Sequence, residues 1–410
     1  EKAMLLKKPT GSFSFIVPGK ILNNKQFKNA RKLICLNHNV IVLKIDDKVF
    51  DEAQVNSVIL LNHKIADKQQ AIYRAFNFNI NGKKLISETF VESILEDEDC
   101  IFRLEINDEF ETIIKKIEIN TLPVKQIAEV KDGIVAGSIK DILFLDKKIN
   151  EDCQKLYFGK NLSRYYLGET DIWVNYRPEE MMAEEVKRKG SKRPGLWMRD
   201  SKIFFREKIL TRFVGKEIIA FYDNQNKFYE HTLHSTHIFD NRIKHKFLVG
   251  LYNSKLINFY YKKTNSQGGD IFPQVRISSV EKLPIKIASE IVQNRIIEKV
   301  DIISELTLQF ENVKSDFYNY TLGKFELNNS NALSNWFKLE FKDFLQILHK
   351  AKVKVEISEE AQWLKYFNEQ KNILANLSYE INKTDSEINQ LVYELYDLTP
   401  EEIKIIEDNI

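Results

Sequence analysis

The residues of this sequence best suited to chemistry are cations interleaved with aromatic side chains between positions 187 and 212. The stretch holds ten Lys or Arg residues and two acidic ones, and Trp197, Phe204 and Phe205 lie among the cations. Cations contact phosphates and aromatic rings stack on bases, so the composition indicates a polyanion site. A solvated helix face or loop would explain the same residues without a ligand. The candidate phosphate contacts here and further along the chain are Lys187, Arg188, Lys192, Arg193, Arg199, Lys202, Arg206, Arg212, Lys262, Lys263 and Arg276.

Two other features are suited to drawing a base out of a duplex. Base flipping needs an aromatic plate for the extruded base and a wedge that fills the gap it leaves. Phe15 lies near the end of an apolar run and is the candidate plate, although it could equally be a core aromatic. Phe272 and Pro273 follow two glycines and an aspartate and are the candidate gap-filling residues, although the segment could equally be an ordinary turn.

Motifs for catalysis or metal binding are weak. His231, His234 and His237 recur every three residues, but in a strand they would alternate faces, and no cysteine accompanies them. Their pattern favours structural or DNA-contacting histidines over zinc ligands. A nuclease pattern of one aspartate followed by Glu-x-Lys is matched by Asp171 and Glu185-Val-Lys187. That pattern needs a strand, however, whereas the segment around 185–187 predicts a helix. We therefore predict neither a metal site nor a catalytic residue in this chain.

The elements that position these residues begin with apolar runs. Residues 12–19, 39–45 and 55–61 are rich in Val and Ile and predict strands, the first one buried in the middle of a sheet. Residues 25–36 predict an amphipathic helix. The order strand, helix, strand, strand is typical of the closing part of an open α/β sheet. We accordingly expect the chain to be the C-terminal part of a longer polypeptide.

The remaining pattern changes twice. Residues 124–287 show short strand-like runs, among them 203–205, 218–222 and 238–239, and a strong helix over 245–261. From 288 onward the period is helical, with helices expected at 336–351, 359–381 and 386–396 and a last one starting at Thr399. The predicted class is α/β plus α, in three domains. Their boundaries are 1–120, 121–287 and 288–410.

Charge and composition narrow the function. The net charge is only +2, which alone argues against a nucleic-acid coat protein. Residues 121–290, however, hold 30 basic and 21 acidic residues, a local net charge of +9. The three widely spaced cysteines predict buried, reduced thiols, and no apolar run approaches the roughly 18 residues of a membrane span. A cytoplasmic protein with no membrane partner and a basic middle is expected.

At this point several segments together resemble a known family, the gamma-class DNA adenine-N6 methyltransferases of restriction–modification systems. The similarity is to the C-terminal portion of type IIG enzymes with a TaqI-like specificity domain. Two segments look like late strands of the methyltransferase fold, whose sheet is Rossmann-like, and others follow the order of the recognition domain. These segments are 13–22, 47–60, Leu156-Tyr-Phe-Gly-Lys-Asn-Leu-Ser-Arg-Tyr-Tyr166, 202–210, Ala220-Phe-Tyr-Asp223, 251–260, 280–285 and 392–403. Asn161, Leu162 and Tyr252 depart from the family pattern.

The resemblance implies roles. Phe15 matches the aromatic that stacks on the extruded adenine, and Pro273 matches the position that fills the gap in the duplex. The partner implied is double-stranded DNA, read in the major groove. The Gly-rich S-adenosylmethionine loop, the Asn-Pro-Pro-Tyr motif and the nuclease motif occur nowhere in this sequence, so no cofactor is expected here. S-adenosylmethionine is expected for the full-length parent, through an N-terminal catalytic portion or a separate subunit. The alternative is a non-enzymatic specificity subunit that positions a separate methylase or nuclease.

Overall fold

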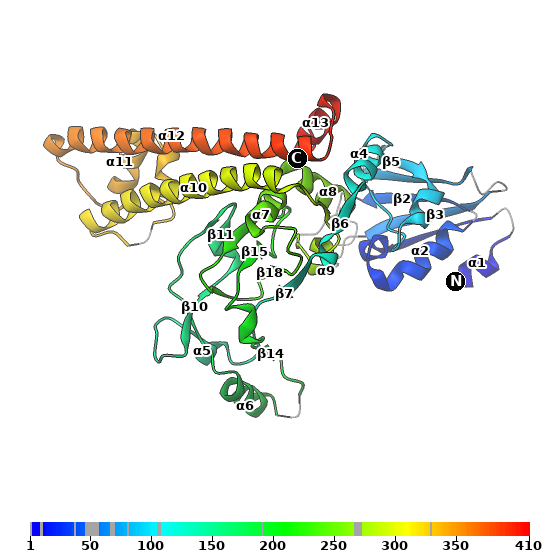
Figure 1. The fold of residues 1–410 in the computed structure, drawn as a ribbon, viewed down its shortest axis with the longest axis horizontal. Coiled ribbons are helices and arrows are strands. Elements are labelled where there is room, and N and C mark those ends of the chain that lie inside the picture. Colours follow the sequence, from blue (N-terminus) through cyan, green and yellow to red (C-terminus); the bar gives the residue numbers. More distant parts are fainter. Residues whose placement is uncertain are drawn as a thin grey trace.

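Three structural parts make up the chain in the computed structural model (Figure 1). The structure describes residues 2–8, 11–36, 38–45, 57–65, 70–79, 82–104, 108–190, 192–265, 273–328 and 330–410. A sheet with short helices forms the N-terminal part, several small sheets and helices form the middle, and two long helices project from it. The mixed α/β class with a helical C-terminal region is confirmed. The domain boundaries stay predictions.

Over its described residues, the N-terminal sheet has five strands in the order β1-β3-β2-β4-β5. Strands β1 and β2 both pair antiparallel with β3, so they run in the same direction, and helix α2 connects them. Strands β2 and β4 pair in parallel. The predicted strand–helix–strand–strand unit is confirmed, and β4 and β5 are strands that the sequence reading missed. The bounds are α1 Lys2–Leu6, β1 Ser12–Pro18, α2 Lys28–Cys35, β2 His38–Ile45, β3 Ser57–Lys64, β4 Ile72–Asn79, β5 Gly82–Phe90, α3 Val91–Glu96 and α4 Asp108–Glu118.

The prediction that 12–19 is a buried strand in the middle of a sheet is wrong for the described chain. Strand β1 lies at the edge of the sheet and pairs with β3 alone among the described strands. Phe15 is 49% exposed and Ile16, which faces the opposite side, is 54% exposed. An apolar run predicts a strand, but it does not say whether neighbours cover both of its faces.

Only one face of this sheet carries a helical layer among the described residues. Val42, Leu60 and Tyr73 are buried there with residues of α2 and α3. On the other face, Ile41 lies opposite Leu61 in the pairing of β2 with β3, and both are only half-buried. The sheet therefore presents an apolar face with no layer over it in the described structure.

The middle part is built on a four-stranded antiparallel sheet, β16-β15-β18-β7, next to a second sheet, β17-β10-β13-β9. Small two-stranded pairs join β11 to β12, β14 to β8 and β19 to β6. The strand bounds are β6 Thr121–Pro123, β7 Ala128–Asp132, β8 Val135–Ala136, β9 Phe144–Leu145, β10 Cys153–Tyr157, β11 Leu162–Ser163, β12 Tyr166–Leu167, β13 Trp173–Asn175, β14 Leu196–Trp197, β15 Lys208–Arg212, β16 Ala220–Asp223, β17 Phe228–Tyr229, β18 Leu233–Ile238 and β19 Pro284–Lys286. The helices are α5 Lys140–Leu143, α6 Pro178–Lys189, α7 His245–Asn253, α8 Lys255–Asn265 and α9 Ile277–Val280.

Two predictions for the middle part are wrong. The run 203–205 is not a strand, because the Asp200 carboxylate accepts a hydrogen bond from the Lys202 amide at 2.9 Å and starts a 3-10 turn at Ser201–Ile203. The single helix over 245–261 is two helices. Ser254 separates them in an extended conformation, and its hydroxyl accepts from the amide of Ile257 at 3.3 Å.

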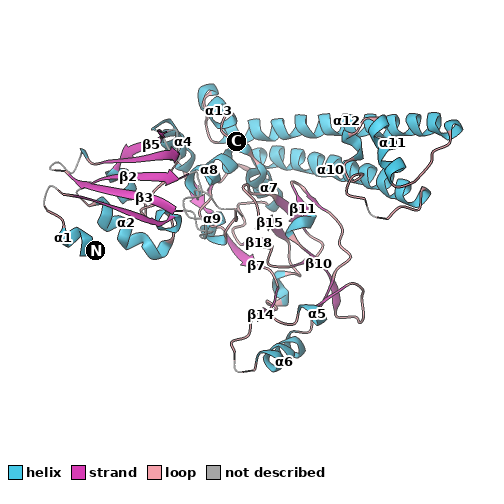
Figure 2. Ribbon diagram, turned by 180° about the vertical axis from the view of Figure 1, so that it is seen from behind, coloured by secondary structure: helices cyan, strands magenta, loops and turns pink. Residues whose placement is uncertain are grey.

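The C-terminal region is a pair of long helices that lie side by side and run in opposite directions (Figure 2). They are α10 Glu290–Lys324 and α12 Ile357–Leu395, with α11 Phe341–Lys350 near their far end and α13 Pro400–Glu407 at the near end. The predicted break between 381 and 386 is wrong. Residues 382–385 contain no Gly or Pro, and the Thr384 hydroxyl bonds the Glu380 carbonyl within the helix at 2.8 Å. The predicted start at Thr399 is confirmed by reciprocal capping with Glu402.

Two cores hold the long helices. Near the middle part they pack with α7 and α8, whereas at the far end Phe317, Trp336 and Phe367 form a separate aromatic core. The three cysteines are buried and unpaired, as predicted. Within the described ranges, no helix has both the length and the apolar character that a membrane crossing requires.

A glycine sets the approach of α7 to α10. A Cβ atom at Gly250 would lie 2.7 Å from Cγ2 of Ile296 and 3.1 Å from Cγ2 of Val300. Gly250→Val should therefore lower the free energy of unfolding by about 1–3 kcal/mol through overpacking. Gly323→Val is the matched control, because a Cβ atom there has no neighbour within 4 Å. Urea titration followed by circular dichroism checks the difference, and equal midpoints for the two variants would contradict it.

Two buried histidines should make the middle part sensitive to acid. Burial lowers the pKa of His237 to about 3 and that of His234 to about 4. In the unfolded chain both imidazoles bind a proton below about pH 6.5, whereas in the folded chain they stay neutral down to about pH 4. The free energy of unfolding therefore falls as the pH drops from about 6.5 toward 4. At pH 5 the loss is about 2 kcal/mol for each histidine. His237→Asn should reduce the fall in the urea midpoint between pH 7 and pH 5. The control His349→Asn, at an exposed position, should leave that fall as large as in the wild type.

Candidate nucleic-acid interface

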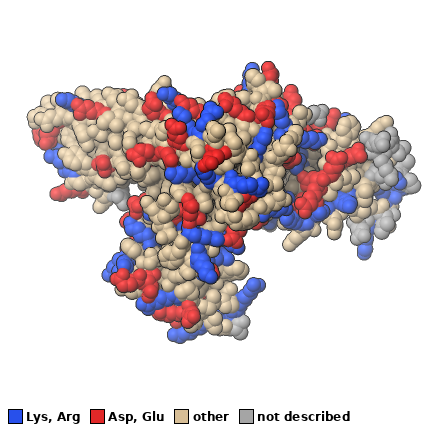
Figure 3. Space-filling model, in the orientation of Figure 1, with Lys and Arg blue, Asp and Glu red and all other residues tan. Residues whose placement is uncertain are grey.

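The basic stretch 187–212 does not form one continuous surface. It runs through the end of α6, a loop, β14, a 3-10 turn and β15. Figure 3 shows Lys and Arg atoms mixed with Asp and Glu atoms over this part of the molecule on the side in view. A count along the sequence therefore overstates the charge presented to a ligand.

Several of the predicted phosphate contacts are paired within the protein. Arg188 bonds Asp141 at 2.6 Å, Arg199 bonds Asp132 at 3.0 Å and Lys262 bonds Glu217 at 2.8 Å. Arg206 forms an ion pair with Glu129 and, together with Lys131, lowers the pKa of that carboxyl to about 2. A phosphate would have to compete with these carboxylates.

The other predicted cations divide into exposed and enclosed ones. Lys192, Arg193 and Lys202 are exposed, and no ion pair holds them among the described residues. Lys187 is also exposed and lies 3.7 Å from Glu184. Lys263 is buried, with its ammonium 4.2 Å from the Phe110 ring centre, so it faces the interior rather than a ligand.

The loop that carries Lys192 and Arg193 is held in place by a buried glutamate of α6. The Glu185 carboxylate accepts hydrogen bonds from the amides of Ser138 and Gly195, each at 2.8 Å, and from the Ser138 hydroxyl. Burial alone would raise the pKa of Glu185, but these bonds hold it below its ordinary value. Glu185 therefore ties the far end of the loop, at Gly195, to α6 and to the segment around Ser138, and its carboxylate is occupied by these donors rather than turned toward a metal.

The cavity with the most suitable lining is a groove in the middle part, which we call the aromatic groove. Its volume is about 1000 Å³. Phe144 and Phe158 meet edge to face at 5.8 Å, and the Lys160 ammonium lies 5.9 Å from the Phe158 ring centre. The groove is lined by the aromatic and apolar side chains of Phe144, Phe158, Ile172 and Val214, by the cations Lys140, Lys160 and Arg212, by the carboxylates Asp141 and Asp146, and by Ser138, Gly159 and Thr232. It combines ring surfaces for bases with cations for phosphates or base edges.

The structure places two of the predicted site residues, Pro273 and Arg212, near each other beside this groove. The Pro273 carbonyl accepts from the Gly215 amide at 2.9 Å, and the Val275 amide donates to the Phe213 carbonyl at 2.7 Å. Pro273 is thereby anchored next to the segment that carries Arg212 into the groove. Phe272 lies outside the described residues. Phe15 lies on the N-terminal sheet, 5.4 Å from the Phe13 ring, and does not line the groove.

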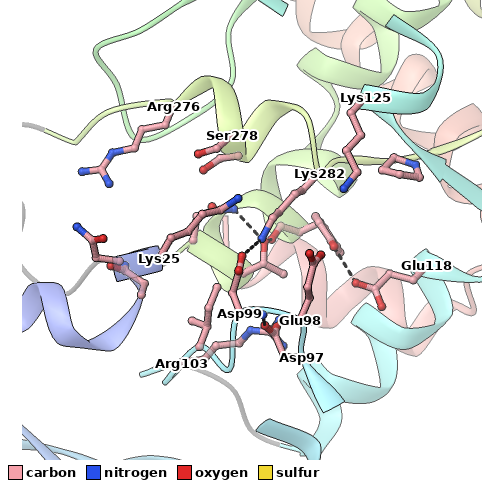
Figure 4. Close-up of a pocket in the computed structure, with 18 residues that line it drawn as sticks. Lys25, Asp97, Glu98, Asp99, Arg103, Glu118, Lys125, Arg276, Ser278 and Lys282 are labelled. Carbon is pink, nitrogen blue, oxygen red and sulfur yellow. Dashed lines mark hydrogen bonds and ion pairs between the residues drawn. The ribbon is translucent and has the colours of Figure 1, made fainter. Parts of the chain in front are cut away.

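A second, polar cavity of about 460 Å³ lies where the N-terminal part meets the middle part. Figure 4 shows Arg103 beside the carboxylates Asp97, Glu98 and Asp99, and the ion pair between Lys282 and Asp99 crosses the cavity. Arg276, another predicted contact, lines this junction cavity, only three residues beyond Pro273. Residues 273–276 therefore run from the aromatic groove to the junction cavity.

The histidines do not form a metal site in the described structure. His237 Nε2 lies 2.6 Å from the Ser235 hydroxyl, and His234 is buried beside it in β18. Among the residues that the structure describes, no three His, Cys, Asp or Glu side chains gather in a way that could hold a metal ion.

The sequence reading missed Lys140, Phe144, Phe158 and Lys160 as groove residues. One signal pointed to them. In the structure, a Cβ atom at Gly159 would lie 2.8 Å from the Thr232 carbonyl oxygen, so glycine lets this turn approach the backbone before β18. The Gly-Lys pair at 159–160 also belongs to a segment that carried the resemblance.

Comparisons with known proteins find similarity to parts of this chain. No curated protein matches the chain. Among solved structures, the type IIL restriction–modification enzyme MmeI in complex with DNA is 9% identical with a TM-score of 0.49, over 97% of this chain and 49% of that one. The type IIG restriction endonuclease BpuSI is 11% identical with a TM-score of 0.35, over 71% of this chain and 42% of that one. These TM-scores lie below 0.5, too low to carry a fold or an activity over to this chain.

The chain thus spans less than half the length of either of these enzymes. Two family models match parts of it. Residues 289–392, which cover most of the long helices, match a domain of unknown function. Residues 154–285, which include most of the aromatic groove, match the TaqI-like C-terminal specificity domain.

Proposed function

We propose that this chain is the DNA-recognition part of a restriction–modification enzyme and that its middle part binds duplex DNA. The observation that carries the proposal is the aromatic groove, most of whose lining lies in the segment that matches the TaqI-like specificity domain. Lys160 and Arg212 supply charge inside the groove, and the exposed Lys192, Arg193 and Lys202 supply it nearby in the same segment. Phosphate contacts of this kind position a protein on DNA, and groove contacts select the sequence.

The finer proposal is a site-specific adenine-N6 methyltransferase of the gamma class, as in type IIG enzymes. Two observations support it. Strands β1 and β2 run in the same direction through helix α2, as the last strands of a Rossmann-like methyltransferase sheet would. Phe15 is exposed and accessible for stacking on an extruded base, with Pro273 as the gap-filling residue.

Such an enzyme needs a catalytic portion with its S-adenosylmethionine, either N-terminal on the same polypeptide or on a separate subunit. The uncovered apolar face of the N-terminal sheet, with Ile41 and Leu61 half-buried, supports a further layer of polypeptide packing there. The alternative function is a non-enzymatic specificity subunit that positions a separate methylase or nuclease. The projecting helices α10 and α12 favour that alternative, because their far end has its own aromatic core and is available for protein contacts.

Binding should depend on the unpaired cations. The chain should shift duplex DNA at low salt, with an affinity that falls steeply as salt rises. The triple variant K192A/R193A/K202A should bind at least about tenfold more weakly at moderate salt and reduce the slope of log affinity against log salt by about three. Fluorescence anisotropy with a labelled duplex over a salt series measures both quantities.

The matched control removes three exposed lysines of the helical region, in K342A/K350A/K354A, and should leave affinity and slope unchanged. An equal loss of affinity in the control variant would contradict the assignment of the DNA-binding surface to the middle part. A wild-type chain that binds no duplex even at low salt would overturn the proposed function itself.

A further inference from the structure

One arginine of the middle part differs from its neighbours. Most arginines there meet a carboxylate, for example Arg177 with Asp152 at 2.8 Å. The Arg212 side chain makes no hydrogen bond or ion pair within the described chain, and its Nε atom is buried. The Nη1 and Nη2 groups are not enclosed and have no acceptor among the described residues either, so they are free to bond to a ligand in the groove.

The position of Arg212 is fixed by its surroundings. It ends strand β15, where its amide donates to the Ile219 carbonyl at 3.2 Å. Two glycines make room for the side chain. A Cβ atom at Gly159 would lie 3.3 Å from Cγ of Arg212, and one at Gly215 would lie 3.4 Å from Nη2. The guanidinium is therefore held in a slot rather than free to swing, and it lines the aromatic groove.

The surroundings of the Arg212 guanidinium favour one kind of hydrogen-bond acceptor on DNA over another. A planar guanidinium bonds best to two acceptors in one plane, which either a phosphate or the O6 and N7 atoms of guanine provide. Phe144, Phe158 and Val214 give the groove apolar walls. Such walls suit the flat edge of a base better than a phosphate, which loses its hydration there. The exposed Lys192, Arg193 and Lys202, outside the lining of the groove, are better placed for phosphates.

We propose that Arg212 reads a guanine of the target sequence, as a specificity-determining residue of the aromatic groove. This inference rests on the proposed function. The N–H groups of Arg212 donate to O6 and N7 of one guanine in the major groove, and Pro273 lies next to that contact through its bond to Gly215.

The test exposes a pool of duplexes with randomised sequence to each protein, recovers the bound duplexes and sequences them. The proteins are the wild-type chain and the variants Arg212→Ala, Arg212→Lys and Lys202→Ala. The wild type should enrich a motif that contains a G:C pair. Both Arg212 variants should lose the preference at one G:C position and keep the rest of the motif, because Lys keeps the charge but not the fork. Discrimination at that position should fall by roughly 5- to 150-fold. Lys202→Ala should bind more weakly with the motif unchanged.

A second arm keeps the protein unaltered. The wild type should bind less well to a selected duplex that carries 7-deazaguanine at the assigned position, and the Arg212 variants should not distinguish the two duplexes. An unchanged motif in both Arg212 variants, or an equal loss on all sequences as for a phosphate contact, would overturn the guanine assignment while leaving duplex binding intact. Failure of the wild type to bind any duplex would instead remove the proposed function, and the guanine assignment with it.

Discussion

A guanidinium or ammonium removed from water must find acceptors, and this requirement organises much of the chain. Arg31 is fully buried in the N-terminal part, where it donates to the carbonyls of Asp99 at 2.7 Å and of Ile21 and Cys100 at 2.8 Å. It thereby holds together the segments that border the junction cavity. Arg164 joins the middle part to the long helices through an ion pair with Asp385. In the four-stranded sheet, the fully buried Lys208 pairs with Asp223 at 2.6 Å.

The same requirement decides which cations remain for a ligand. An ion pair in the protein lowers the gain from a phosphate, because the carboxylate must first be displaced or must stay nearby and repel it. Arg188, Arg199 and Arg206 thus act mainly as ties between elements of the middle part. The exposed Lys192 and Arg193, on a loop held by Glu185, keep their charge available. The interface is defined by unpaired cations rather than by the net charge of +9 over residues 121–290.

The sequence correctly predicted the elements that are determined by neighbouring residues along the chain. The Val and Ile runs marked β2 and β3, and the capping residues marked the start of α13. They did not show that β1 lies at an edge, because that depends on which strands pair. They also did not reveal the pairing of Arg188 with Asp141, which are 47 residues apart in sequence. The aromatic groove was missed for the same reason, because Phe144, Phe158 and Arg212 meet only through the two sheets of the middle part.

The short segment 273–276 connects recognition to the rest of the molecule in the proposed function. The carbonyl of its first residue, Pro273, accepts a hydrogen bond from Gly215, three residues beyond Arg212, and Arg276 lines the cavity shared with the N-terminal part. Across that cavity, Lys282 pairs with Asp99, whose carbonyl accepts a bond from Arg31. In the proposed function, a base contact at Arg212 is therefore connected to the N-terminal part through the backbone of 212–215 and 273–282 and through the hydrogen bonds and the ion pair that join these segments to Arg31. Under the proposed function, this connection sets the distance between the base read at Arg212 and the edge strand that carries Phe15, as acting on one defined base of a target sequence requires.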